Sequence, residues 1–188
     1  MSAPPTLPEI VDRARRLSHR RGFVSSCRNE TGRLLAALAA SRSGTLAETG
    51  TGCGVGSAWL RSGMRPGSRL VTAEHDGKLA RAVSEIFDGD EAVTVLEADW
   101  TTLASYAPFS LLFLDVREAK HAGPDHVAEL VEPGGYVVLD DFTPYDGWPP
   151  MYDGRVDTLR ERWLTNPGFV TAEVMVALDA SVLIATRR

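Results

Sequence analysis

The sequence predicts an α/β fold with a doubly wound, mostly parallel sheet of seven strands. Short apolar runs alternate with helical stretches along most of the chain, which is typical of parallel strands joined by right-handed crossovers. Runs such as SLLFLDV and GYVVLDD are continuously apolar, as strands buried on both faces are. The last two runs, residues 169–178 and 181–186, are joined by only two residues, too few for a crossover. We therefore expect a C-terminal antiparallel hairpin at one edge of the sheet.

The elements before that hairpin follow from the period of the apolar residues. The chain opens with two helical patterns: residues 8–17 are amphipathic and arginine-rich, and residues 30–40 consist of strong helix formers. Strands are expected at 45–49, 69–74, 92–97, 110–115 and 136–140. Helices are expected between them at 57–63, 78–87 and 125–131, with a short turn at 101–106. Nearly every strand ends in a polar residue, and open parallel sheets bind ligands at those carboxyl ends.

Length and composition indicate one globular domain of 188 residues, with N-terminal helices over residues 1–41 and a core over residues 42–188. Hydrophobic residues make up 44% and charged residues 24%, which argues against disorder and against a coiled coil. No apolar run approaches the roughly 20 residues that span a bilayer, and the first residues lack an export signal pattern. Two cysteines are too few for a disulfide framework, so we expect a cytoplasmic protein.

The formal net charge of −5 argues against a nucleic-acid partner. One basic cluster near the N-terminus stands out against this charge: Arg13, Arg15, Arg16, His19, Arg20 and Arg21. Two interpretations of the cluster stay open, namely a solvated helix face and a clamp for an anionic substrate.

A glycine-rich loop, ETGTGCGVGS over residues 48–57, follows the first expected strand. Its alternating glycines let the backbone pass close to a ligand, and the helix after it offers free N–H groups. A dinucleotide fingerprint would need glycine or alanine at the third position of G-x-G-x-x-G/A. The three possible registers place Val55, Ser57 and Trp59 there, so this fingerprint fails. There is also no G-K-[ST] for a nucleoside triphosphate.

The loop closely resembles the E-x-G-x-G-x-G loop of class I S-adenosylmethionine-dependent methyltransferases, whose fold is Rossmann-like. An acid at the end of the second strand and a Pro-Gly-Gly lead into the fifth strand, residues 133–135, support the resemblance. The resemblance implies three groups of cofactor-binding residues. Glu48, Gly50, Thr51, Gly52, Gly54 and Ser57 would hold the amino-acid part, Glu74 the ribose, and Ala98, Asp99 and Trp100 the adenine, with His75 and Asp115 also lining the cofactor.

The acidic residues that follow the fourth and fifth strands resemble the metal-binding positions of catechol O-methyltransferase and related cation-dependent O-methyltransferases. In that family an aspartate after the fourth strand and an Asp-Asp or Asp-Asn pair after the fifth hold a metal, and Asp115, Asp140 and Asp141 match these positions. Three carboxylates so close together need a cation, and oxygen ligands suit Mg²⁺, with Mn²⁺ or Ca²⁺ as alternatives. Helix capping or orientation of the ligands is the other interpretation of this trio.

One position departs from the family. A lysine three residues after the first metal aspartate acts there as general base, and this chain has Glu118 instead. Lys120 is a replacement if the segment VREAKH bends back, and His121 is a second candidate because its unperturbed pKa suits a base near neutrality. The aromatic, proline-rich segment of residues 142–152 is expected to form a lid over a flat substrate, or else a packed surface loop.

These features predict an enzyme that methylates a small molecule with S-adenosylmethionine, at oxygen and with a divalent metal. The resemblance implies a phenolic or catechol-like acceptor and is compatible with a homodimer, since related enzymes are often dimers. The alternatives are a metal-independent methyltransferase of oxygen or nitrogen, a non-catalytic adenosylmethionine-binding protein and, less favoured, an NAD-dependent dehydrogenase.

Overall fold

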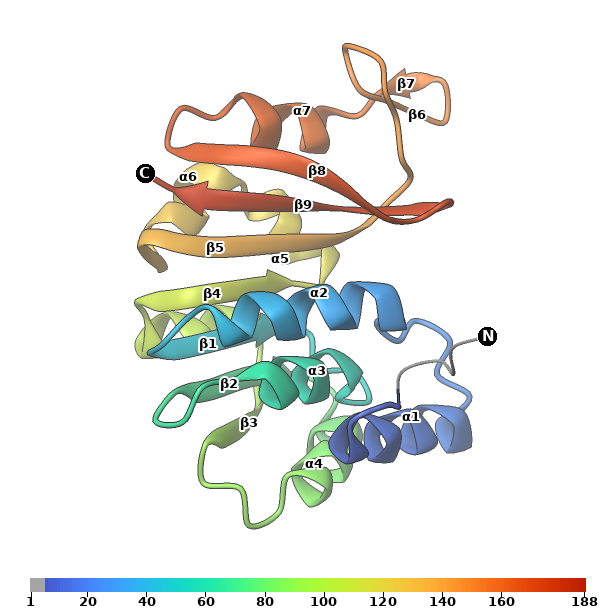
Figure 1. The fold of residues 1–188 in the computed structure, drawn as a ribbon, viewed down its shortest axis with the longest axis vertical. Coiled ribbons are helices and arrows are strands. Elements are labelled where there is room, and N and C mark those ends of the chain that lie inside the picture. Colours follow the sequence, from blue (N-terminus) through green and yellow to red (C-terminus); the bar gives the residue numbers. More distant parts are fainter. Residues whose placement is uncertain (1–5) are drawn as a thin grey trace.

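A seven-stranded sheet organises the computed structural model, which describes residues 6–188 (Figure 1). Its strand order is β3-β2-β1-β4-β5-β9-β8. These strands are β1 (Thr45–Thr49), β2 (Arg69–Glu74), β3 (Val93–Glu97), β4 (Phe109–Leu114), β5 (Val131–Phe142), β8 (Phe169–Ala177) and β9 (Ala180–Arg187). The first five pair in parallel, whereas β9 pairs antiparallel with both β5 and β8. The predicted fold class, including the terminal antiparallel hairpin, is confirmed.

Helices cover both faces of this sheet. One face carries α1 (Glu9–Arg21), α2 (Asn29–Ala40), α3 (Val55–Gly63) and α4 (Gly77–Ile86). The other carries the 3₁₀ helix η1 (Trp100–Tyr106) with α5 (Arg117–Ala122), α6 (Pro124–Ala128) and α7 (Thr158–Thr165). The chain therefore forms three layers, with the sheet between two layers of helices. No helix within residues 6–188 is long and apolar enough to cross a bilayer.

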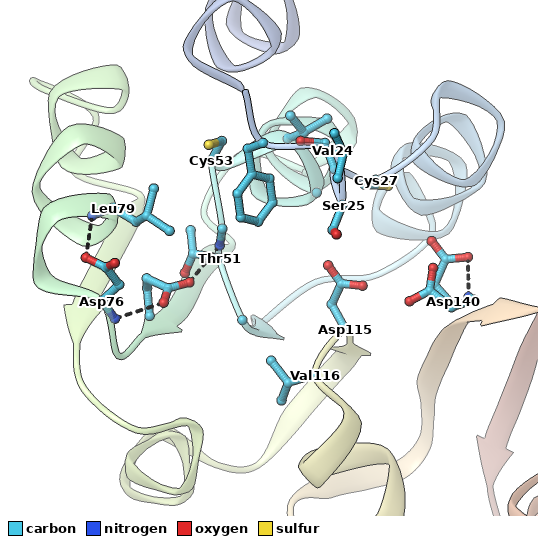
Figure 2. A pocket seen from close by; sticks show the side chains of 18 of the residues that line it. Val24, Ser25, Cys27, Thr51, Cys53, Asp76, Leu79, Asp115, Val116 and Asp140 are labelled. Carbon is cyan, nitrogen blue, oxygen red and sulfur yellow. Dashed lines mark hydrogen bonds between the residues drawn. The ribbon is translucent and has the colours of Figure 1, made fainter. Parts of the chain in front are cut away.

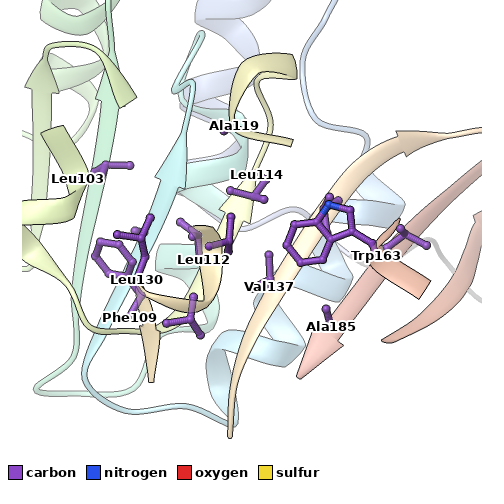
Figure 3. Packing of buried hydrophobic residues seen from close by; sticks show 14 of the residues in the cluster. Leu103, Phe109, Leu112, Leu114, Ala119, Leu130, Val137, Trp163 and Ala185 are labelled. Atoms are coloured by element: carbon purple, nitrogen blue, oxygen red, sulfur yellow. The ribbon is translucent and has the colours of Figure 1, made fainter. Parts of the chain in front are cut away.

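The core is split by the sheet because neighbouring residues of a strand point to opposite faces. Leu46 and Leu111 pack under α2 and α3, while their neighbours Ala47 and Leu112 face the other layer. Figure 3 shows this second layer, in which the fully buried Trp163 of α7 packs against the C-terminal strands of the sheet, β5 and β9. Continuous apolar strands are thus explained by burial on both sides, as the sequence indicated.

The order of the strands reverses between β1 and β4, which are neighbours in the sheet although β2 and β3 separate them in the chain. Such a switch point opens a crevice at the carboxyl ends of the two strands. In this protein the glycine loop leaves β1 there, and Asp115 follows β4 at the same edge. The fold therefore brings the two motifs singled out in the sequence to one place.

Four segments differ from the expected elements. The stretch 117–122 forms helix α5, where a loop had been expected; most of its residues are strong helix formers. Strand β5 begins at Val131, so α6 ends sooner than expected. The expected lid instead ends in β6 (Met151–Tyr152), which forms a small hairpin with β7 (Arg155–Val156).

Candidate active site

The glycine loop crosses the carboxyl end of the sheet between β1 and α3. Gly50 has a φ of 80°, and a Cβ at this position would collide with the side chain of Val116. Only glycine meets both constraints. The backbone N–H groups of Gly50 and Thr51 donate to the Ala73 carbonyl at 3.0 and 3.2 Å, so the end of β2 fixes the loop.

Glu48 lies beneath this loop and is 1% exposed. Its Oε2 accepts hydrogen bonds from the hydroxyls of Ser57 and of Thr72, the latter at 2.9 Å. Burial raises the pKa of Glu48 to about 8, although these two hydrogen bonds act in the opposite direction. Gly54 also lies below the surface, against Val83 of α4. The structure thus places Glu48, Ser57 and Gly54 under the loop, which they hold in shape, rather than on the surface where the cofactor was expected to meet them.

Glu74 ends β2 and reaches the cavity above the loop. Its Oε2 accepts from the Gly52 N–H at 2.8 Å, and its Oε1 accepts from the Asp76 N–H at 2.9 Å. Each carboxylate oxygen has two lone pairs, so both oxygens can accept one further hydrogen bond. Glu74 is therefore fixed in orientation by the backbone and still free to bind a ligand hydroxyl.

A recess of about 280 Å³ adjoins this cavity beyond Gly50. It is lined by Ala98, Asp99 and Trp100, the three residues expected around an adenine, and by the exposed His75. Asp99 also caps η1, because its Oδ1 accepts from the Thr101 N–H and hydroxyl, and these bonds lower the pKa of Asp99. Asp99 therefore caps η1 and also forms part of the wall of the recess.

The main cavity, of about 710 Å³, lies between the glycine loop, the end of β2 and the aspartates after β4 and β5 (Figure 2). Its roof is the segment from Phe23 to Arg28, which joins α1 to α2. In Figure 2, Asp115 points into the cavity toward Ser25 of this roof. This roof was not predicted from the sequence, although the break between two helical patterns at Gly22, which ends α1 with a φ of 60°, was a signal for it.

Asp115, Asp140 and Asp141 meet where the main cavity joins a second one. Burial raises the pKa of Asp115 to about 7 and also raises the pKa of Asp140. The Asp140 Oδ1 accepts from the Thr31 hydroxyl at 3.2 Å and from the Asp141 N–H at 2.9 Å. Asp141 adopts a left-handed φ of 68°, and its side chain is 74% exposed. The three carboxylates therefore share one corner but point in different directions.

Lys120 reaches this corner from α5. Its side chain is 8% exposed, and its Nζ donates to the Asp140 carbonyl at 2.9 Å and to the Asp141 Oδ2 at 3.0 Å. Residues two apart on a helix point about 200° apart, so Glu118 faces away and lines the adenine-side recess instead. His121 is exposed and lines the second cavity. The helix, rather than a bent loop, brings the lysine back toward the aspartates.

The second cavity also has a volume of about 710 Å³ and extends from these aspartates to α7. Phe142, Thr143 and Tyr152 of the expected lid line it. Tyr145 of the same segment lines a separate groove, and Trp148 is 64% exposed. Only the two ends of the segment 142–152 therefore cover the cavity, and its central aromatic residues point elsewhere.

The aspartate trio does not fit the divalent metal that the resemblance implied. Among the residues that the structure describes, no group of three His, Cys, Asp or Glu side chains is placed to hold a metal ion. Asp140 uses its Oδ1 to accept from Thr31 and from the next backbone N–H, and the Oδ2 of Asp141 is paired with the Lys120 ammonium. The described residues thus hold no preformed set of three ligands at Asp115, Asp140 and Asp141, where a metal site was expected.

Comparison with known proteins identifies the family. Residues 47–142, about half of the chain, match a family model described as a methyltransferase domain. A protein of Mycobacteroides abscessus, assigned by name to the O-methyltransferases, is 32% identical over 176 residues, which cover 83% of this chain and 78% of the relative. A Mycobacterium tuberculosis relative with the same assignment is 31% identical over 165 residues, and the match spans 66% of its length. The chain therefore belongs to the class I S-adenosylmethionine-dependent O-methyltransferases.

Solved structures agree on the fold. An O-methyltransferase from Bacillus cereus in complex with S-adenosylhomocysteine superposes with a TM-score of 0.77 at 18% identity, covering 97% of this chain and 92% of the other. TomG from Streptomyces achromogenes, an O-methyltransferase of tomaymycin synthesis in complex with S-adenosylmethionine, gives 0.76 at 20% identity with the same coverage. These solved structures confirm the fold, while the family match and the relatives exclude the dehydrogenase alternative.

Proposed function

We propose that this chain transfers the methyl group of S-adenosylmethionine to a hydroxyl oxygen of a small aromatic acceptor. The observation that carries the proposal is the junction of two cavities, each of about 710 Å³, at Asp115, Asp140 and Asp141. One cavity lies over the glycine loop and takes the cofactor, and the other lies under the lid segment and takes the acceptor. The assignment of the relatives to the O-methyltransferases supports oxygen over nitrogen.

The cofactor is oriented by groups that the structure has already fixed. Glu74 binds the ribose hydroxyls with its free lone pairs, while the recess of Ala98, Asp99 and Trp100 takes the adenine. The backbone between Gly50 and Gly52 faces the amino-acid part. The sulfonium then lies near the Asp115 carboxylate, and opposite charges favour this placement.

The acceptor oxygen forms a bond to the methyl carbon as the sulfur–carbon bond breaks, and S-adenosylhomocysteine leaves. The hydroxyl proton must go to a base. Asp115 lines both cavities and has a pKa of about 7, which suits proton transfer near neutrality. Lys120 uses its ammonium group to hold the acceptor oxygen and stabilise the negative charge that develops on it. Proximity and alignment supply much of the remaining acceleration.

The walls of the acceptor cavity favour a flat, partly apolar molecule. Phe142 and Tyr152 supply aromatic surface, and Lys120 and the aspartates form the polar end. A phenol or catechol fits this division, with its ring between the aromatic side chains and its hydroxyl at the cavity junction.

The test combines cofactor binding with turnover. Calorimetry should show that S-adenosylmethionine and S-adenosylhomocysteine bind with micromolar affinity, roughly −8 kcal/mol, and that NAD does not bind. Mass spectrometry of reactions with matched phenols and anilines should detect S-adenosylhomocysteine and a methyl ether, but no methylamine. Cofactor binding without product from any acceptor would instead support the non-catalytic alternative.

A further inference from the structure

We infer that the Lys120 ammonium is a built-in cation, which serves the aspartate trio in place of a divalent metal and makes methyl transfer independent of metal. The inference deepens the proposed function, on which it rests, because it assigns the source of positive charge at the acceptor oxygen. It depends on the geometry at the ends of β4 and β5 and on the position of one helix.

Three acidic side chains at adjoining strand ends repel one another unless a positive charge lies between them. Lys120 supplies that charge: its Nζ lies 3.0 Å from the Asp141 Oδ2 and 2.9 Å from the Asp140 carbonyl oxygen. Its side chain is only 8% exposed, so water solvates the ammonium poorly. A charge buried in this way needs an oppositely charged partner. The lysine and the aspartates therefore compensate one another.

The position of Lys120 is fixed by packing rather than by the ion pair alone. The Lys120 carbonyl accepts from the Trp163 indole N–H at 3.4 Å, and Trp163 is fully buried. The Lys120 N–H donates to the Val116 carbonyl at 3.2 Å within the first turn of α5. Ala119, its neighbour, is fully buried in the core. The ammonium is thus delivered by a rigid part of the fold.

A metal at the same corner would compete with Lys120 for the Asp141 carboxylate. Mg²⁺ requires near-octahedral oxygen ligands at roughly 2.1 Å. If Asp141 left Lys120 to become a ligand, the buried ammonium would face a divalent ion and keep only the Asp140 carbonyl as a partner. The existing contacts therefore oppose metal binding as long as the lysine is present.

This arrangement predicts that metal binding is gained when the charge of Lys120 is removed. Lys120→Met keeps most of the side-chain volume and leaves three carboxylates without a cation, and Lys120→Gln is a second neutral variant. Lys120→Arg retains the charge, and Lys78→Ala removes the only other lysine of the chain, which is exposed at the start of α4. The last two variants are the matched controls.

The experiment titrates Mn²⁺ into each protein and follows free Mn²⁺ by electron paramagnetic resonance. Thermal melts and S-adenosylhomocysteine affinity show that each variant is folded. We expect the parent, Lys120→Arg and Lys78→Ala to leave Mn²⁺ free. Lys120→Met and Lys120→Gln should bind one Mn²⁺ per chain about ten-fold or more tightly than the parent. Adding Asp141→Asn to Lys120→Met should abolish this gain. The parent should keep its turnover within about two-fold after chelation, because no metal-bound step is lost.

Two results would overturn the inference: stoichiometric Mn²⁺ binding by the parent, or no binding by any folded neutral variant. Failure of the proposed function is a separate result, since it would appear as absence of S-adenosylmethionine binding in the parent. The Mn²⁺ titration of the aspartate corner does not depend on cofactor binding.

Discussion

The proposed cofactor half of the site, over the glycine loop, and the proposed acceptor half, between the aspartates and α7, are held together in different ways. In the cofactor half, the backbone of the glycine loop bonds to the end of β2, through the Ala73 carbonyl and the Glu74 carboxylate. In the acceptor half, side chains from distant parts of the chain meet: Thr31 and Asp140, which share a hydrogen bond, are 109 residues apart. The first half is a local motif set on a strand end, whereas the second depends on how whole helices pack.

This difference separates binding from chemistry. A change in the cofactor half should alter affinity for S-adenosylmethionine, while a change in the acceptor half should alter turnover and leave that affinity intact. Each of the following substitutions tests one side of that division.

Lys120→Met should have the largest effect and should lower turnover by about 10²-fold, because it removes a charged donor from the developing oxyanion. Cofactor affinity should stay within about three-fold, since Lys120 lines only the acceptor cavity. Steady-state kinetics and calorimetry on the same preparation measure both quantities. His121→Ala is the matched control at the cavity rim and should leave turnover within a few-fold of the parent. If Lys120→Met also kept turnover within a few-fold of the parent, the lysine would have no part in the reaction.

Glu74→Ala should weaken S-adenosylmethionine binding by about 1.5–3 kcal/mol, because it removes a charge-assisted hydrogen bond to the ribose. The loop also loses the acceptor of its Gly52 N–H, which adds to the effect. Glu97→Ala is the control, since Glu97 lies in register with Glu74 on β3 and its side chain is half exposed. Calorimetry that found equal affinities for the two variants would remove Glu74 from the ribose site.

Glu48→Gln should change the pH dependence of stability. The pKa of Glu48 rises from 4.5 to about 8 on burial, so between these values the folded state holds a proton that the unfolded state has released. Its contribution to stability is complete below about pH 4.5 and is lost as the pH rises to about 8, by up to about 1.4 kcal/mol per pH unit. Urea unfolding should show a steeper decline in the parent and in Glu91→Gln, an exposed control, than in Glu48→Gln, where the raised pKa values of Asp115 and Asp140 still contribute. An unchanged slope would mean that Glu48 is not protonated in the folded state.

Asp179→Asn should have the smallest effect. The Asp179 carboxylate accepts two hydrogen bonds from Arg28, at 2.8 and 3.0 Å, and thereby joins the roof of the cofactor cavity to the β8–β9 turn. Both side chains are exposed to solvent, where such pairs contribute little, so S-adenosylhomocysteine affinity should change by less than about five-fold. A larger loss, measured by calorimetry, would show that the roof depends on this link.

The sequence predicted the cofactor half well because its signals are local. The bounds of β1 and β2 match the structure residue for residue, and Glu74, Asp99 and Asp115 lie at strand ends as expected. Glu48 was predicted to contact the cofactor, but the structure buries it beneath the glycine loop. Strand position alone does not distinguish a carboxylate above the loop from one beneath it.

The acceptor half was harder to predict because it depends on tertiary packing. Whether Lys120 meets the aspartates is decided by the helical turn at Arg117–Ala122, whose pattern is too short to identify in the sequence. The lid shows the same limit: aromatic composition indicated a cover, but the direction of Tyr145 and Trp148 is set by the loop around them. The metal prediction relied on strand-end positions and on family resemblance, which do not determine the contacts that Lys120 makes with Asp140 and Asp141.

A crystal structure with S-adenosylhomocysteine and a large excess of Mn²⁺, analysed by anomalous scattering, tests the account most directly. We predict the cofactor sulfur beside Asp115, Lys120 still bonded to Asp140 and Asp141, and no anomalous peak between the three carboxylates. A manganese ion bound by these aspartates, with Lys120 displaced from them, would contradict the account.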